Sequence, residues 1–280
     1  MQSVIKISSL LLVAAAVSVA TGTLNAQAQL NVYLSSPGSQ STVFTGTQVE
    51  NFEGFGQANY STNLTATDAN SGTPFGTYEL GGASQLAILP NDIYGTNTGQ
   101  YAAFGSRNSS AGDVVLRLNT PQSYFGFSWN AGDRNNTLTF LRNGSVVGSY
   151  TTATTVSILS APTVTALNGN VYNSSSYFGQ PGSGANGGEP YGFLNFIFDN
   201  PNAFDAVVFG NSGNSTETGF ETDNHTIRLI APTPGPDFVP VTQDPAVPEP
   251  APIALAAILG GGILGQIVRV RIKNRKTSAE

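Results

Sequence analysis

The sequence predicts an all-β protein built as an antiparallel, two-sheet β-sandwich. Short segments rich in Val, Phe, Tyr, Ile and Leu are separated by stretches rich in Gly, Ser, Thr and Asn. Several of these segments alternate with a period of two, as strands with one buried face do. No segment of a dozen residues has helical periodicity with caps. Many short strands with turns between them favour a sandwich over an α/β fold.

The strongest strand signals lie in the middle of the chain. Segment 123–129 places three aromatic side chains on one side, and segments 113–118 and 136–141 alternate in the same way. Asn143-Gly144 then provides a hairpin signal, because both residues tolerate a positive φ. Residues 146–150 are expected to form the returning strand.

Further strands are expected on both sides of this region, and together they indicate a jelly-roll or carbohydrate-binding-module type of sandwich. The additional strands are predicted at 43–52, 78–80, 86–89, 101–104, 191–198, 203–209 and 225–230. Segment 173–189 is so rich in Gly, Ser and Asn that we expect a long exposed loop.

The N-terminal segment has the layout of a cleaved secretory signal. Lys6 precedes an apolar run, and Ala26-Gln27-Ala28 offers small residues at both positions that a signal peptidase reads. We therefore expect a signal peptide over 1–28, with Gln29 as the first residue of the mature chain, and the sandwich domain over 29–230.

Charge and cysteine content limit the function of the exported region. Between Gln29 and Val247 there are five Arg, no Lys and fifteen Asp or Glu, so the formal charge is −10. Such a surface has no basic stripe for phosphates, which argues against nucleic-acid binding. The chain has no Cys and a single His, so thiolate chemistry and multi-His metal sites are excluded.

The C-terminal region divides into a spacer and a tripartite tail. Seven of the twenty residues in 231–250 are Pro, which predicts an extended linker over 231–246. The tail, 247–276, begins with Pro248-Glu249-Pro250 and continues as an uncharged run over 251–268 that is long enough to cross a bilayer. Five basic residues follow and would remain in the cytoplasm: Arg269, Arg271, Lys273, Arg275 and Lys276.

This order of motif, apolar helix and basic residues resembles the PEP-CTERM sorting signal of bacterial exported proteins. The resemblance implies recognition by a membrane-embedded exosortase, cleavage near the Pro-Glu-Pro element and delivery to the cell surface or exopolysaccharide matrix. Segments 124–130, 136–140 and 220–224 also resemble the β-rich domains of such proteins, although His225 stands where an apolar residue is usual. Those domains mostly lack an assigned biochemical activity.

Two acidic segments could supply oxygen ligands to one structural Ca²⁺. Glu53 lies near the first predicted strand, and Asp223 and Asn224 lead into the last. The first and last strands of sandwich modules are commonly neighbours, so these three residues form a candidate calcium site. The alternative is that they are solvated turn residues, since Asp-Asn is ordinary turn chemistry.

Aromatic residues provide a second candidate site. Tyr172 and Tyr177, in the predicted loop, are candidates for contact with a polysaccharide, whereas Trp129 is expected in the core with the Phe residues of its strand. His225 with Asp223 does not predict a Ser-His-Asp triad, because no GxSxG elbow exists. A polar residue on the final strand is the preferred interpretation of His225.

These observations predict a non-enzymatic protein that passes through the inner membrane as a single-pass intermediate and ends at the cell surface or in the extracellular matrix. Signal peptidase and an exosortase are its expected partners, and its role would be structural or adhesive in exopolysaccharide or biofilm. One alternative is a carbohydrate-binding module of the same fold, with calcium as a structural ion. A lesser one is an extracellular glycoside hydrolase, because any two of the fifteen carboxylates might form a catalytic pair.

Overall fold

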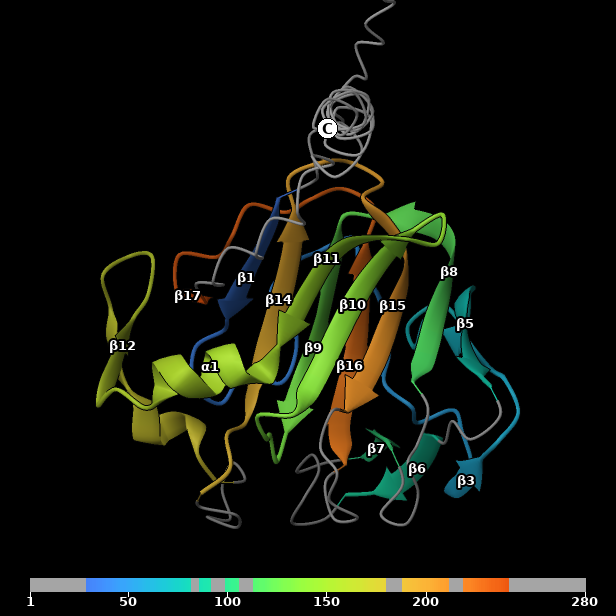
Figure 1. Cartoon of the computed structure of the whole chain (residues 1–280), viewed down its shortest axis with the longest axis horizontal. Coiled ribbons are helices and arrows are strands. Elements are labelled where there is room, and N and C mark those ends of the chain that lie inside the picture. The colour runs from blue at the N-terminus through green and yellow to red at the C-terminus, as the bar shows by residue number, and fades with distance from the viewer. Residues whose placement is uncertain are drawn as a thin grey trace, which may run out of the picture.

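The computed structural model describes residues 29–81, 86–91, 99–105, 113–179, 188–211 and 219–241. The predicted signal peptide, the Pro-Glu-Pro motif, the apolar run and the basic tail lie outside the described residues. Within the described part, two antiparallel sheets are packed face to face, so the all-β prediction is confirmed. Figure 1 shows strands of the smaller sheet in front of strands of the larger one.

The larger sheet has nine strands, and residues from segments far apart in the chain lie side by side in it. Its order is β17 (Val239–Val241), β1 (Leu30–Leu34), β14 (Gly192–Phe198), β9 (Tyr124–Asn130), β16 (Phe220–Arg228), β7 (Gln100–Phe104), β6 (Leu86–Pro90) and β3 (Ala58–Tyr60), with β2 (Gln48–Glu50) also paired to β16.

The smaller sheet has six strands and is followed by a short two-stranded sheet. The order of the six is β11 (Ser145–Thr151), β10 (Asn136–Arg142), β15 (Phe204–Asn211), β8 (Val114–Gln122), β5 (Pro74–Leu80) and β4 (Leu64–Thr67), and the short sheet pairs β12 (Thr163–Thr165) with β13 (Val171–Asn173). Figure 1 shows β12 standing beside the sandwich.

One aromatic core joins the two sheets. Phe125, Phe127 and Trp129 of β9 are fully buried, as their alternation predicted. Rings from opposite sheets are in contact: Phe104 of β7 stacks on Phe209 of β15 with ring centroids 4.4 Å apart. Burial of a large aromatic side chain is worth about 1.5–3 kcal/mol, so this cluster stabilises the cysteine-free domain.

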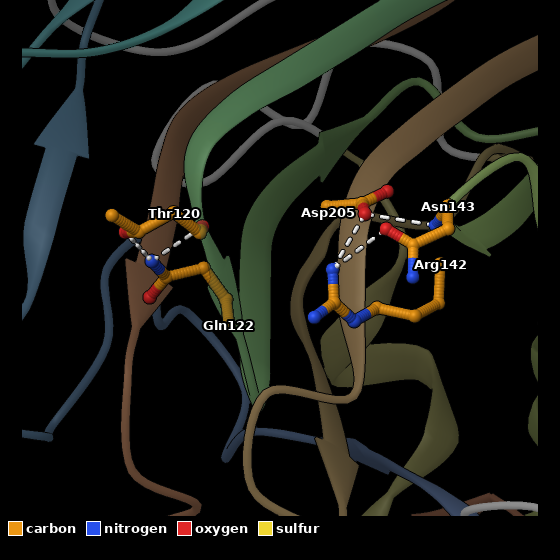
Figure 2. A network of polar contacts seen from close by, with 5 residues as sticks. All are labelled: Thr120, Gln122, Arg142, Asn143 and Asp205. Atoms are coloured by element: carbon orange, nitrogen blue, oxygen red, sulfur yellow. Dashed lines mark hydrogen bonds and ion pairs between the residues drawn. The ribbon is translucent and has the colours of Figure 1, made fainter.

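The predicted hairpin at Asn143-Gly144 is confirmed, and an acidic residue of the neighbouring strand holds it. Both turn residues have positive φ, +50° and +79°, as a two-residue turn between twisted strands requires. Asp205 of β15 accepts hydrogen bonds from the Arg142 guanidinium and the Asn143 backbone N–H, both at 2.8 Å. Figure 2 shows this convergence beside the Gln122 amide, which bonds back to Thr120.

The sequence did not predict the one α-helix of the described residues, α1 (Thr152–Leu159). This helix is only eight residues long and rich in β-branched residues, which are poor helix formers. Thr151 caps its N-terminus by accepting a hydrogen bond from the Ala153 N–H. Thr152, Thr155 and Leu159 are buried, so tertiary packing compensates for the weak propensity.

The boundary predicted at residue 230 is wrong, because part of the Pro-rich segment forms a strand of the larger sheet. β17 pairs with β1, Val241 lying opposite Val32 and Val239 opposite Leu34. Phe238, Val239 and Val241 are all at least 96% buried. Pro240 is tolerated because β17 is an edge strand, where a missing N–H breaks no ladder. The sandwich therefore extends at least to Val241.

The exposed loop predicted over 173–189 is also partly wrong. Residues 174–177 form a short 3₁₀ helix, η1 (Ser174–Tyr177), and Phe178 forms a bridge with Pro190. Ser174 and Tyr177 are buried. Composition alone missed this because one buried aromatic ring, that of Tyr177, and backbone bonds such as that from the Ser174 N–H to the Pro162 carbonyl oxygen fix a segment whose other residues are polar.

Candidate functional site

The two acidic segments linked in the sequence analysis meet at the pairing of β2 with β16. In this pairing Glu50 lies opposite His225. Glu53 follows on an exposed turn, where its Oε1 accepts a hydrogen bond of 2.6 Å from the Gln100 N–H. Glu53 is also close enough to Asp223 for its charge to contribute to the raised pKa of that carboxyl.

A β-bulge in β16 separates the side chains of Asp223 and His225. The register with β9 shifts between Asp223, opposite Ser128, and Thr226, opposite Gly126. Asn224 supplies the extra residue in a left-handed conformation, with φ +54°. Ordinary alternation would place Asp223 and His225 on one face. The bulge instead turns His225 into the sandwich core and leaves Asp223 on the outer face of the sheet.

His225 is fully buried among aromatic rings, which corrects its interpretation as a polar residue of a final strand. Its ring lies nearly parallel to that of Phe209, with centroids 4.9 Å apart. The Nδ1 atom is 2.9 Å from the Tyr78 hydroxyl, and Nε2 is 2.8 Å from the Thr222 hydroxyl. Burial lowers the pKa of His225 to about 3, so the imidazole is neutral at pH 7. Both nitrogens are thus committed to core contacts.

Asp223 is a buried carboxyl that accepts hydrogen bonds from the next residue, within its own turn. Its side chain is 5% exposed, and it accepts hydrogen bonds from the backbone N–H and the side-chain amide of Asn224. Burial, together with the nearby charges of Glu53 and Glu50, raises the pKa of Asp223 to about 8. A carboxyl with this pKa is largely protonated at neutral pH and is a weak ligand for a hard cation.

Of the three candidate calcium ligands, Glu53 and Asp223 lie near each other, whereas Asn224 uses its side-chain amide in a bond to the chain before β2. Asn224 directs its side-chain N–H at the backbone oxygen of Gln40, 3.0 Å away, and Glu53 caps a backbone N–H. Across the described residues, no three Asp, Glu or His side chains are arranged to hold a metal ion. The pairing of the strands was foreseeable from the sequence, whereas the bulge that orients each side chain was not.

A pair of carboxyls that the sequence did not single out lies at one end of β9 and β14. Burial raises the pKa of Asp133, and burial together with the charge of Asp133 raises the pKa of Glu189. The Gly132 N–H bonds the backbone oxygen of Pro190 at 2.9 Å, which fixes the two segments together. The Glu189 Oε2 atom is buried without a hydrogen-bond partner. Chain separation of 56 residues hides this pair from sequence inspection.

The two tyrosines proposed for glycan contact differ in exposure. Tyr177 is 1% exposed, and its hydroxyl donates to the backbone oxygen of Ser35 at 2.9 Å, so its predicted exposure is wrong. Tyr172 lies on β13 and is half-buried. Its hydroxyl approaches Asp237 Oδ1 at 3.5 Å, and Asn168 and Asn170 donate to the same oxygen.

Comparison with known proteins does not assign this chain to a family. No protein-family model matches the chain, and none of the curated proteins compared with it is significantly similar. Among the residues that the structure describes, no helix is long and apolar enough to span a bilayer. The class defined by the fold is therefore an all-β protein of two antiparallel sheets.

Proposed function

We propose that this chain is an exported protein of the cell surface or extracellular matrix, delivered by an exosortase and acting as a structural or adhesive unit in exopolysaccharide. The observation that carries the proposal is the ordered C-terminal tail, in which Pro248-Glu249-Pro250 precedes an uncharged run and a basic cluster. The leader over 1–28 supports the same route, and a jelly-roll-like sandwich is its cargo.

The described fold is compatible with a non-catalytic role. The single His of the chain is held in the core by Tyr78 and Thr222, away from any surface where a substrate would bind. After Val241 only six residues precede Pro248, a reach of about 20 Å at roughly 3.3 Å per residue. The sandwich would therefore remain close to the membrane until the tail is cut.

Fractionation of the native cells tests this proposal. The mature protein should be found at the surface or in the matrix, and its mass should lack the residues beyond the Pro-Glu-Pro element. Deletion of the exosortase should retain the full tail in the inner membrane. Replacement of Pro248-Glu249-Pro250 by three Ala should have the same effect, and normal release of this variant would overturn the proposal.

The second candidate is a carbohydrate-binding module, favoured by the hairpin of β12 and β13. This hairpin stands beside the sandwich (Figure 1) and exposes Leu167 and Val171 next to Tyr172. An aromatic ring flanked by amides and a carboxylate is the usual chemistry of saccharide recognition. Glycan-array binding that is lost in Tyr172→Ala but retained in Val146→Ala, on the distant exposed strand β11, would support this candidate.

A hydrolase is the third candidate and depends on Asp133 and Glu189 alone. Two carboxyls with raised pKa values are the groups that glycoside hydrolysis uses. Cleavage of a polysaccharide that disappears in Glu189→Gln would promote this candidate over the structural role. A structural calcium ion at Glu53, Asp223 and Asn224 remains part of the carbohydrate-binding candidate, although no group of three Asp, Glu or His side chains among the described residues is arranged to hold a metal ion.

A further inference from the structure

The fold holds the residue that leader cleavage would make the first of the mature chain. The backbone nitrogen of Gln29 donates a hydrogen bond of 2.8 Å to Asp199 Oδ1. The Asp199 N–H bonds the Gln29 carbonyl oxygen in return, at 3.2 Å. β1 begins at the next residue, with Leu30 paired to Phe198. Gln29 is thus fixed between the first strand and the turn that follows β14.

We infer that Asp199 is the counter-ion of the mature N-terminus. This inference rests on the proposed export and on cleavage after Ala28. Cleavage replaces the amide N–H of Gln29 by an ammonium group, whose ordinary pKa of about 7.7–8.0 keeps it mostly protonated at pH 7. The nitrogen already lies at hydrogen-bond distance from the carboxylate, so no rearrangement is needed. The neutral hydrogen bond becomes a charge-assisted one.

The start of β1 limits where the leader can end. Val32 and Leu34 are 3% and 1% exposed and belong to the core. A cut beyond Leu30 would remove residues that pair with β14. The cleavage site predicted after Ala28 leaves both the strand and the two bonds between Gln29 and Asp199 complete.

The ion pair has a chemical consequence for an N-terminal glutamine. Its free amine can attack its own side-chain carbonyl carbon, so that a C–N bond forms and the amide nitrogen leaves as ammonia, which yields pyroglutamate. Only the unprotonated amine is a nucleophile. Asp199 stabilises the protonated form of the Gln29 amine, and the pairing of Leu30 with β14 holds the backbone that follows Gln29 in place. Asp199 therefore slows cyclisation of Gln29.

The test compares three full-length chains that begin at Gln29 and retain the C-terminal tail: wild type, Asp199→Asn and Glu79→Gln. Glu79 is the matched control, since it is an exposed carboxylate paired with Arg117 on the other sheet at 2.7 Å. Loss of ammonia is followed by intact mass at pH 7, and thermal unfolding is measured at low and at high salt.

Asp199→Asn should cyclise about two- to fivefold faster than wild type, as expected from an exposed ion pair. Its melting temperature should fall by about 1–3 °C at low salt, and salt at about 1 M should remove most of this difference. Glu79→Gln should cyclise at the wild-type rate. Equal cyclisation of wild type and Asp199→Asn would overturn the inference, even if Asp199→Asn lowered stability.

A fourth chain separates charge from mere hydrogen bonding. When Ala28 is retained, Gln29 has only a neutral N–H, so Asp199→Asn should then change the melting temperature less than in the chain that begins at Gln29. An equal change in both chains would contradict the ionic role. The intact mass of protein from native cells tests the processing itself: a first residue other than Gln29 would overturn the inference for the native protein, whereas retention of the whole leader would overturn the proposed export.

Discussion

The two sheets share one core but differ in what lies on their outer faces. Every residue of β9 and β14 is buried, whereas β8 and β10 alternate between buried and more exposed residues. Alternation is expected of a strand with one face in water. The centre of the nine-stranded sheet is therefore covered on both sides, and the six-stranded sheet on one.

The cover of the larger sheet comes from the segment between β1 and β2. The Thr42 hydroxyl lies 3.1 Å from the Tyr124 hydroxyl, and the Phe44 ring packs edge-on against Tyr124 with centroids 5.1 Å apart. Earlier in the same segment, the backbone oxygen of Gln40 accepts a hydrogen bond from the Asn224 side-chain amide. Polar side chains beneath this segment are cut off from water and must find protein partners. A strand whose apolar residues alternate can therefore lie in a sheet with one face in water, as β10 does, or in a sheet covered on both faces, as β9 does.

The largest expected effect concerns the part that the two sheets share. Phe127→Ala in β9 and Phe140→Ala in β10 should each lower the free energy of unfolding by about 3–5 kcal/mol, because both rings are fully buried in one core. Val146→Ala, at a 55% exposed position, should change it by less than about 0.5 kcal/mol. Denaturant unfolding measures all three, and a large difference between the two Phe variants would break the idea of a common core.

Removal of a polar side chain should lower the free energy of unfolding more on the covered outer face of the larger sheet than on the exposed outer face of the smaller one. Asn195 of β14 accepts from the Tyr124 hydroxyl and donates to Ser35 Oγ, both at 2.9 Å. Asn195→Ala leaves the Ser35 hydroxyl without this partner and the Tyr124 hydroxyl with Thr42 alone, and should cost about 1–3 kcal/mol. Thr139→Ala, on the outer face of β10, should cost less than about 0.5 kcal/mol beyond strand propensity. Equal costs in denaturant unfolding would show that the covering segment does not exclude water.

Asp223 should make stability depend on pH through the same covered face. Its pKa is about 8 in the folded chain and about 3.9 when unfolded, so the folded state binds the extra proton between these values. Stability from this group is complete below about pH 4 and is lost as the pH rises toward 8. Asp223→Asn cannot ionise.

Relative to wild type, Asp223→Asn should therefore gain about 2 kcal/mol between pH 6 and pH 8. Unfolding free energies measured across this range check the prediction. His225 lowers the stability as the pH falls below about 6.5, because the unfolded chain then binds a proton that the buried imidazole does not bind. A difference between variant and wild type that stays constant from pH 6 to pH 8 would mean that water reaches Asp223.

The smallest effect belongs to the exposed face of the six-stranded sheet. Arg117 of β8 and Glu79 of β5 form an ion pair whose side chains are 51% and 38% exposed. Glu79→Gln should lower the free energy of unfolding by less than about 1 kcal/mol, and salt should screen even that. A loss above about 2 kcal/mol at high salt would show that this face, too, is covered.

Much of the core was predictable from alternation. Phe125, Phe127 and Trp129 lie on one side of β9, and Leu138 and Phe140 lie on one side of β10, as their spacing indicated. The turn at Asn143-Gly144 was equally foreseeable because few residue pairs adopt two positive φ angles. The short strand β3 and the helix α1 were missed, since their residues have weak local preferences that packing overrides.

The candidate sites were harder to predict because they depend on orientation. The approach of Glu53 to Asp223 followed from the pairing of distant strands, but the bulge at Asn224 decided which side chain faces the core. The burial of Tyr177 depends on the backbone oxygen of Ser35, 142 residues earlier. The carboxyl pair of Asp133 and Glu189 forms only when two loops meet.

The sequence by itself determined the class of fold, the acidic and lysine-free character of residues 29–247, and the order of an apolar N-terminal segment, a β-rich region and a Pro-Glu-Pro motif with an apolar run behind it. These properties depend on composition and local periodicity, which each residue carries with it. Only the tertiary structure decided that His225 is a core residue, that the Pro-rich segment supplies β17, and that Gln29 meets Asp199. Such contacts arise between residues far apart in the chain, and no local pattern encodes them.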